Sequence, residues 1–117
     1  MSHVSEKAVL VPSVTKTNGF SIQWGNVPVK PAQRKQLLSG LRRSVSLGKS
    51  LRGFGLSIIL HHIGRVFTIR AVVNDAHGKA ECHVKETHWH SGMRQLLRSL
   101  HNLIHTRRLE MLRLATG

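Results

Sequence analysis

A long amphipathic helix is the clearest element that the sequence predicts. From Trp89 to about Arg113 the apolar residues recur every three or four positions, as they do on one face of an α-helix. These apolar positions are Met93, Leu96, Leu97, Leu100, Leu103, Ile104 and Met111. A second stripe with the same spacing carries basic or titratable side chains and no carboxylate: Arg94, Arg98, His101, His105 and Arg108. We therefore expect one face of this helix to be buried and the other to meet an anionic partner.

Three β-strands joined by short turns are predicted directly before this helix. Residues 56–63 form a dense aliphatic run, and residues 66–73 alternate apolar and polar side chains after a turn at Gly64 and Arg65. Residues 74–78 are typical of a second tight turn, and residues 79–85 alternate again. The side chains expected on the buried face of the last two strands are Phe67, Ile69, Ala71, Val73, Ala80, Cys82 and Val84.

The first half of the chain predicts one further strand and one further helix. Residues 20–24 place Phe20, Ile22 and Trp24 on one face, which is typical of a half-buried strand. A helix is expected from Pro31 to Val45, because Pro suits the first helical position. Its buried stripe consists of Leu37, Leu38, Leu41 and Val45.

Gly40 and the residues after this helix qualify that picture. A glycine inside a helix costs about 1 kcal/mol relative to Ala, so the helix either packs closely against a neighbour at Gly40 or is marginal. Residues 46–55 are rich in Gly and Ser and predict a loop, which carries Lys49 and Arg52. We expect this loop to be basic.

The element order is therefore β-α-β-β-β-α, and the expected fold class is α+β. A four-stranded sheet with alternating faces has one side to cover, and two amphipathic helices on one face can cover it, giving a two-layer sandwich. Residues 19–114 are expected to form a single domain. Residues 1–18 are interpreted as a flexible leader, or at most as an added edge strand from Ala8 to Val11. The patterns do not fix the order of the strands in the sheet.

Charge is the unusual feature of the composition. The chain has 117 residues, the size of one domain, with 18 Lys and Arg against 5 Asp and Glu, a net charge of +13. Such an excess indicates an anionic partner, either nucleic acid or an anionic membrane surface. The lone Cys82 cannot form an internal disulfide and fits a reducing compartment. No apolar run approaches the roughly 20 residues of a membrane-spanning helix. We expect a cytoplasmic protein.

Catalytic and cofactor signatures are absent from the sequence. The five acidic residues are scattered, and neither nucleophile triads nor Gly-rich phosphate loops occur in the right context. His101 and His105 lie one helical turn apart, but no second cysteine or His-Glu-x-x-His pattern accompanies them, so no metal site or cofactor is expected. With 4% aromatic residues and no tyrosine, phosphate-directed contact with structured RNA is favoured over base stacking. We expect no enzyme and no small-molecule substrate.

Three segments resemble a known protein family. Residues 29–34, Val-Lys-Pro-Ala-Gln-Arg, are similar to the start of the first helix in the ribosome hibernation-promoting factors and ribosome-associated inhibitor A, also called sigma-54 modulation proteins. Residues 74–78 resemble the turn between that family's last two strands. The spacing to the final helix also fits, although residues 88–93 read His-Trp-His-Ser-Gly-Met where the family usually has Asp-Met-Tyr. The similarity covers about residues 20–112 and indicates a diverged, short form without the extra C-terminal dimerisation domain.

The resemblance implies binding to the small ribosomal subunit. Members of this family sit between its head and body, contact ribosomal RNA and silence translation under stress. The family's basic helix positions correspond here to Arg43, Arg98, His101 and His105, and the two histidines would make part of the charge depend on pH. A monomer is expected.

The RNA-binding candidates are the basic residues of both helices: Arg34, Lys35, Arg42, Arg43, Arg94, Arg98, His101, His105 and Arg108. A solvated helix face is the plainer interpretation, although such faces usually mix charges of both signs. Two other functions stay open. One is a general binder of structured or double-stranded RNA, and the other is a peripheral protein on an anionic membrane surface.

Overall fold

The computed structural model describes residues 13–17 and 19–116. The chain runs β-β-α-β-β-β-α, and the four strands and two helices predicted from the sequence are all present. One further strand precedes them. The elements are β1 (Ser13–Thr17), β2 (Phe20–Gly25), α2 (Pro31–Gly48), β3 (Gly55–Ile63), β4 (Val66–Asp75), β5 (Gly78–Glu86) and α3 (Trp89–Thr116).

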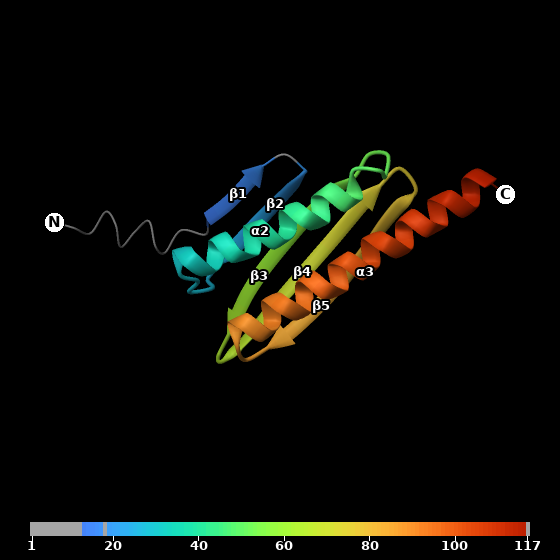
Figure 1. Ribbon diagram of the computed structural model, residues 1–117. Helices are drawn as coiled ribbons and strands as arrows, with labels where there is room; N and C mark the ends of the chain where they lie inside the picture. Colours follow the sequence, from blue (N-terminus) through green and yellow to red (C-terminus); the bar gives the residue numbers. More distant parts are fainter. Residues whose placement is uncertain (1–12, 18, 117) are drawn as a thin grey trace.

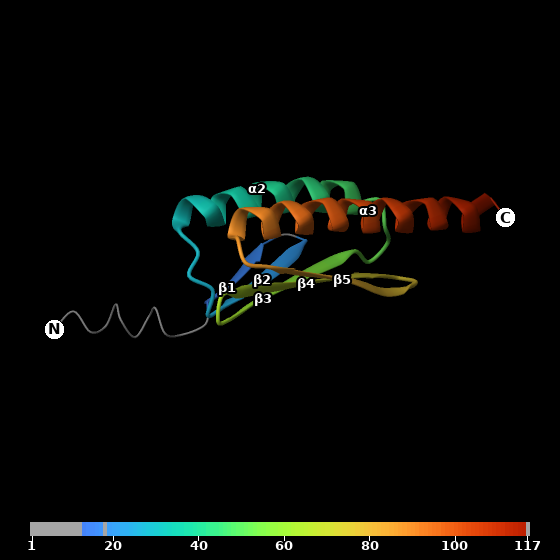
Figure 2. The same ribbon diagram turned by 90° about the horizontal axis from the view of Figure 1, so that it is seen from below.

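The five strands form one mixed sheet in the order β1-β2-β3-β4-β5 (Figure 1). Neighbouring strands are antiparallel except β2 and β3, which run parallel because α2 carries the chain back between them. Both helices lie on the same face of the sheet, as Figure 2 shows. The α+β class and the covering of one face by two helices are thus confirmed.

The prediction of a four-stranded sheet is wrong, because β1 adds a fifth strand at one edge. β1 pairs antiparallel with β2 and lies within the segment interpreted as a leader. Its sequence, Ser-Val-Thr-Lys-Thr, has no apolar alternation. An edge strand needs none, because it is held mainly by main-chain hydrogen bonds to the neighbouring strand. Trp24 Nε1 also donates a hydrogen bond of 2.8 Å to Thr15 Oγ1. The edge strand proposed for Ala8 to Val11 lies outside the described residues.

α2 begins at Pro31, as predicted, and ends at Gly48, three residues later than the predicted Val45. The backbone N–H of Lys30 donates to Gln33 Oε1 at 3.1 Å, which satisfies one group at the helix start. α3 begins at Trp89, also as predicted, and extends to Thr116 rather than Arg113. The starts of both helices were therefore predicted correctly, that of α2 from Pro31 and that of α3 from its apolar stripe.

The core lies between the sheet and the helix layer. Ile22, Ile58, Leu96, Leu100 and Ile104 are completely buried there. Of the residues expected to share the core beneath α3, Ile69, Val84 and Leu100 are buried, while Cys82 and Leu97 are partly buried against it. Burial raises the pKa of the Cys82 thiol, so this cysteine is a poor nucleophile at neutral pH.

Candidate nucleic-acid interface

The two helices are parallel neighbours, and they pack closely at a position where α2 has no side chain. Both start at the same end of the sheet, as the colours in Figures 1 and 2 show. A Cβ atom on Gly40 would lie 2.5 Å from Leu97 Cδ1 and 2.9 Å from Leu97 Cδ2. Close packing is therefore the reason for the glycine, which resolves the alternative that the sequence left open.

This contact brings the basic stripe of α3 to the seam between the helices. Arg94 precedes Leu97 by three residues and His101 follows it by four, so both share the helical face that meets α2. On α2, Arg43 follows Gly40 by three residues and shares the face toward α3. We call the resulting row of side chains the interhelical strip; it consists of Arg43, Arg94, Arg98, His101, His105 and Arg108. All are exposed except Arg108, which is half-buried.

The other three candidates on α2 lie apart from the interhelical strip. Arg42 follows Gly40 by two residues, which at 3.6 residues per turn places it on the opposite side of α2, and Lys35 lies on that flank as well. Both are exposed. Arg34 is half-buried, with its guanidinium carbon 4.7 Å from the centroid of the Trp24 ring, a cation–π geometry. The structure therefore gathers six of the nine candidates and separates Arg34, Lys35 and Arg42 from them.

Carboxylates are nearly absent from the helix layer. Glu110, near the end of α3, is the one acidic residue within Pro31–Gly48 and Trp89–Thr116. Neither helix has an acidic residue in its first turn. The charge of the interhelical strip is thus not compensated within its own layer, which favours the approach of a polyanion.

One arginine of α3 is engaged internally, which the sequence did not reveal. Arg107 donates from Nε to Asp75 Oδ2 at 2.8 Å and from Nη2 to Asp75 Oδ1 at 2.5 Å, and the Asp75 side chain is only 1% exposed. Hydrogen bonds from Arg107, and then from the backbone N–H of His77, lower the pKa of Asp75 despite its burial. The pKa of Arg107 is raised in turn. This pair fixes α3 to the β4–β5 turn. Because Asp75 neutralises its charge, Arg107 does not add to the positive charge that could bind a polyanion.

Within 13–17 and 19–116, no three His, Cys, Asp or Glu side chains come together as metal ligands. No helix in that part of the chain is long and apolar enough to cross a membrane.

The fold is similar to that of two solved structures. A ribosomal subunit interface protein from Coxiella burnetii superimposes with a TM-score of 0.61 at 14% identity, over 78% of this chain and 98% of that one. The N-terminal domain of Protein Y from Thermus thermophilus superimposes with a TM-score of 0.54 at 13% identity, over 77% and 96%. No protein-family model and no curated protein sequence matches this chain. The resemblance to hibernation factors is thus confirmed as a likeness of fold.

Proposed function

We propose that this protein binds the small ribosomal subunit through ribosomal RNA and thereby silences translation. The observation that carries the proposal is the interhelical strip, in which the Gly40–Leu97 contact gathers cations from two helices into one row. Arginine side chains in such a row can donate hydrogen bonds to successive phosphates of folded RNA. The protein acts by occupying a site, without chemistry, and would do so in the cytoplasm.

The structural likeness supports the ribosome as the source of that RNA. One matched structure is of a ribosomal subunit interface protein, and the match covers 98% of that protein's chain. If this protein also lies at a subunit interface, it would compete there with messenger and transfer RNA for space. Silencing of translation would follow from that competition.

Salt dependence of binding to isolated small subunits tests the electrostatic part of the proposal. Each phosphate contact contributes about 0.7–0.9 to the slope of log affinity against log salt. The variant Arg94→Ala/Arg98→Ala should bind more weakly and with a slope smaller by roughly 1–2. Its matched control is Lys79→Ala/Lys85→Ala, which removes two exposed lysines of β5 from the sheet face that points away from the helices. The control should bind like the wild type.

Co-sedimentation separates the ribosome from the other anionic partners. Tagged protein is spun with small subunits, with duplex RNA of unrelated sequence, or with vesicles containing anionic lipid. We expect retention on small subunits at a salt concentration that releases the duplex RNA and the vesicles. Equal retention on duplex RNA would instead show a general RNA-binding module, and retention on vesicles alone would refute the proposal.

A translation assay tests silencing itself. Added protein should inhibit synthesis of a reporter in a reconstituted system, and excess messenger RNA should relieve the inhibition if the two compete. Binding to the small subunit without inhibition of synthesis would show that the protein binds ribosomes but does not silence translation.

A further inference from the structure

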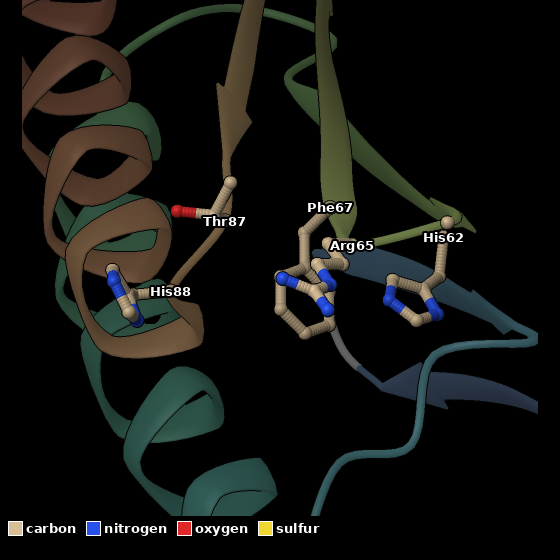
Figure 3. A pocket seen from close by; sticks show the side chains of 6 residues that line it. His62, Arg65, Phe67, Thr87 and His88 are labelled. Atoms are coloured by element: carbon tan, nitrogen blue, oxygen red, sulfur yellow. The ribbon is translucent and has the colours of Figure 1, made fainter.

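A hollow of about 530 Å³ lies where the β3–β4 hairpin meets the start of α3 (Figure 3). Its lining residues belong to the β3–β4 hairpin and to the segment before α3, at the end of the sheet where both helices begin (Figure 2). Two segments distant in sequence line it. The hairpin supplies His62, Gly64, Arg65 and Phe67, and the junction between β5 and α3 supplies Thr87 and His88.

One wall of the hollow is a pair of stacked rings. The ring centroids of His62 and Phe67 are 4.7 Å apart with an interplanar angle of 25°, and Phe67 meets the edge of Trp89 at 6.0 Å. Asn26 holds the main chain of His62 from both sides: its Nδ2 donates to His62 O at 2.9 Å, and its Oδ1 accepts from His62 N at 3.0 Å. The wall is therefore in position before any ligand arrives.

The remaining lining is polar and carries no carboxylate. Arg65 and His88 are exposed, Arg65 in the hairpin turn and His88 just before α3 on the other side of the hollow (Figure 3). The neighbouring Glu86 does not line the hollow, and its carboxylate accepts hydrogen bonds from Thr87 N and Gln95 Nε2. The hollow thus combines an aromatic surface with cationic donors, and a nucleotide is the ligand class that needs both.

We propose that this hollow binds one nucleotide of single-stranded RNA. The base stacks against the His62–Phe67 pair, and a phosphate contacts Arg65 and His88. The inference rests on the proposed RNA binding, because the hollow continues the interhelical strip: His90 follows His88 by two residues and precedes Arg94 by one helical turn. The low aromatic content disfavours base stacking in general, yet the fold places one stacked pair at the end of the cationic row.

Chemical shifts of backbone amides locate the ligand directly. Adenosine monophosphate, a single-stranded tetra-adenylate and inorganic phosphate are titrated separately into the full-length protein at constant ionic strength. We expect the tetra-adenylate and, more weakly, adenosine monophosphate to shift the amides of Gly64, Arg65, Thr87 and His88. Inorganic phosphate should shift them much less, because it has no base to stack. Equal shifts with phosphate would show a plain anion site and overturn the proposal.

A double variant and a matched control test the assigned side chains. His62→Ala/Arg65→Ala removes the outer ring and the turn cation, whereas His61→Ala/Lys85→Ala removes one histidine and one cationic side chain from exposed positions on the opposite sheet face. Loss of one stacked base and one phosphate contact should weaken tetra-adenylate binding about tenfold, and the control should change it less than twofold. Arg65→Ala alone, in an exposed turn, gives the same direction of change if the double variant is poorly folded. Equal weakening in the variant and the control would overturn the assignment.

Two outcomes separate this inference from the proposed function. If tetra-adenylate and adenosine monophosphate bind equally well, the ligand is a free nucleotide and the assignment to an RNA strand fails. If wild-type protein shifts as expected with tetra-adenylate yet does not sediment with small subunits, the hollow is supported and the proposed ribosomal function fails.

Discussion

Replacing Asp75 by Asn should destabilise the protein more than any other single loss of charge in the described part of the chain. The asparagine keeps the shape of the side chain but leaves Arg107 without its counter-ion. Asp75 accepts two hydrogen bonds from Arg107 and one of 2.8 Å from the backbone N–H of His77. In addition, the neighbouring Ala76 N donates to Arg52 O at 2.8 Å. The pair thus connects α3, the β4–β5 turn and the loop after α2.

The expected loss follows from burial. The Asp75 side chain is 1% exposed and that of Arg107 is 16% exposed, so solvent screens the pair weakly. Removing one partner of a buried ion pair typically destabilises by 3–5 kcal/mol, and the residual exposure of Arg107 places this case near the lower end, about 3 kcal/mol. For a domain of this size, that corresponds to a fall in Tm of about 10 °C.

The effect should depend on pH in a defined direction. Because the folded pKa of Asp75 lies below its ordinary value of 3.8, the carboxylate contributes stability above that value and loses it as the pH falls through the folded pKa. The asparagine variant has no such titration. The stability gap between wild type and variant should therefore be constant from pH 7 to about 5 and should narrow as the pH approaches 3.

Urea unfolding followed by tryptophan fluorescence measures the gap. The matched control is Glu81→Gln, which breaks the exposed pair between Arg70 and Glu81 and should destabilise far less. The double variant Asp75→Asn/Arg107→Met should be more stable than Asp75→Asn alone, because it removes the uncompensated charge. A gap below about 0.5 kcal/mol, or one that does not narrow at low pH, would refute the reasoning.

Three other expectations concern the core, a turn and the interhelical strip. Leu100→Ala removes a fully buried side chain beneath α3 and should destabilise by about 2–5 kcal/mol in urea unfolding; a loss below about 1 kcal/mol would mean that α3 does not cover the core. Gly25→Ala should lose at least about 2 kcal/mol, because Gly25 has a φ of 58° and a Cβ there would lie 2.4 Å from Leu60 O; an unchanged Tm would contradict that strain. His101→Lys/His105→Lys adds permanent charge to the interhelical strip and should strengthen small-subunit binding at pH 7.5 severalfold, whereas unchanged affinity would exclude this face of α3 from the interface.

The helices and their faces were predictable because their signals are local. The apolar stripe of α3 predicts which face of the helix is buried, and the basic stripe follows from the same period. β1 escaped prediction because an edge strand needs no buried face of its own. The parallel pairing of β2 with β3 was also hidden, since alternation identifies which face is buried and not which strand lies alongside.

The candidate site could be predicted from the sequence only in part, for a related reason. The sequence identified basic residues on each helix, but the close approach at Gly40 decides which of them lie together. Arg43 joins the row from α3, whereas Arg42, its neighbour in sequence, lies on the other side of α2. The hollow and the Asp75–Arg107 pair depend on contacts between segments that are distant in sequence. Asp75 and Arg107 are 32 residues apart, and local residue spacing does not predict such contacts.

The parallel pairing of β2 and β3 also bears on how the chain assembles. β3, β4 and β5 follow one another through tight turns and lead straight into α3, so their contacts close short loops and form with little loss of chain entropy. The whole of α2 separates β2 from β3 in the chain, although Phe20 lies opposite Leu56 in the sheet. Long-range contacts of this kind form late and open early. We therefore expect the hairpins and α3 to form first and β1, β2 and α2 to dock onto them.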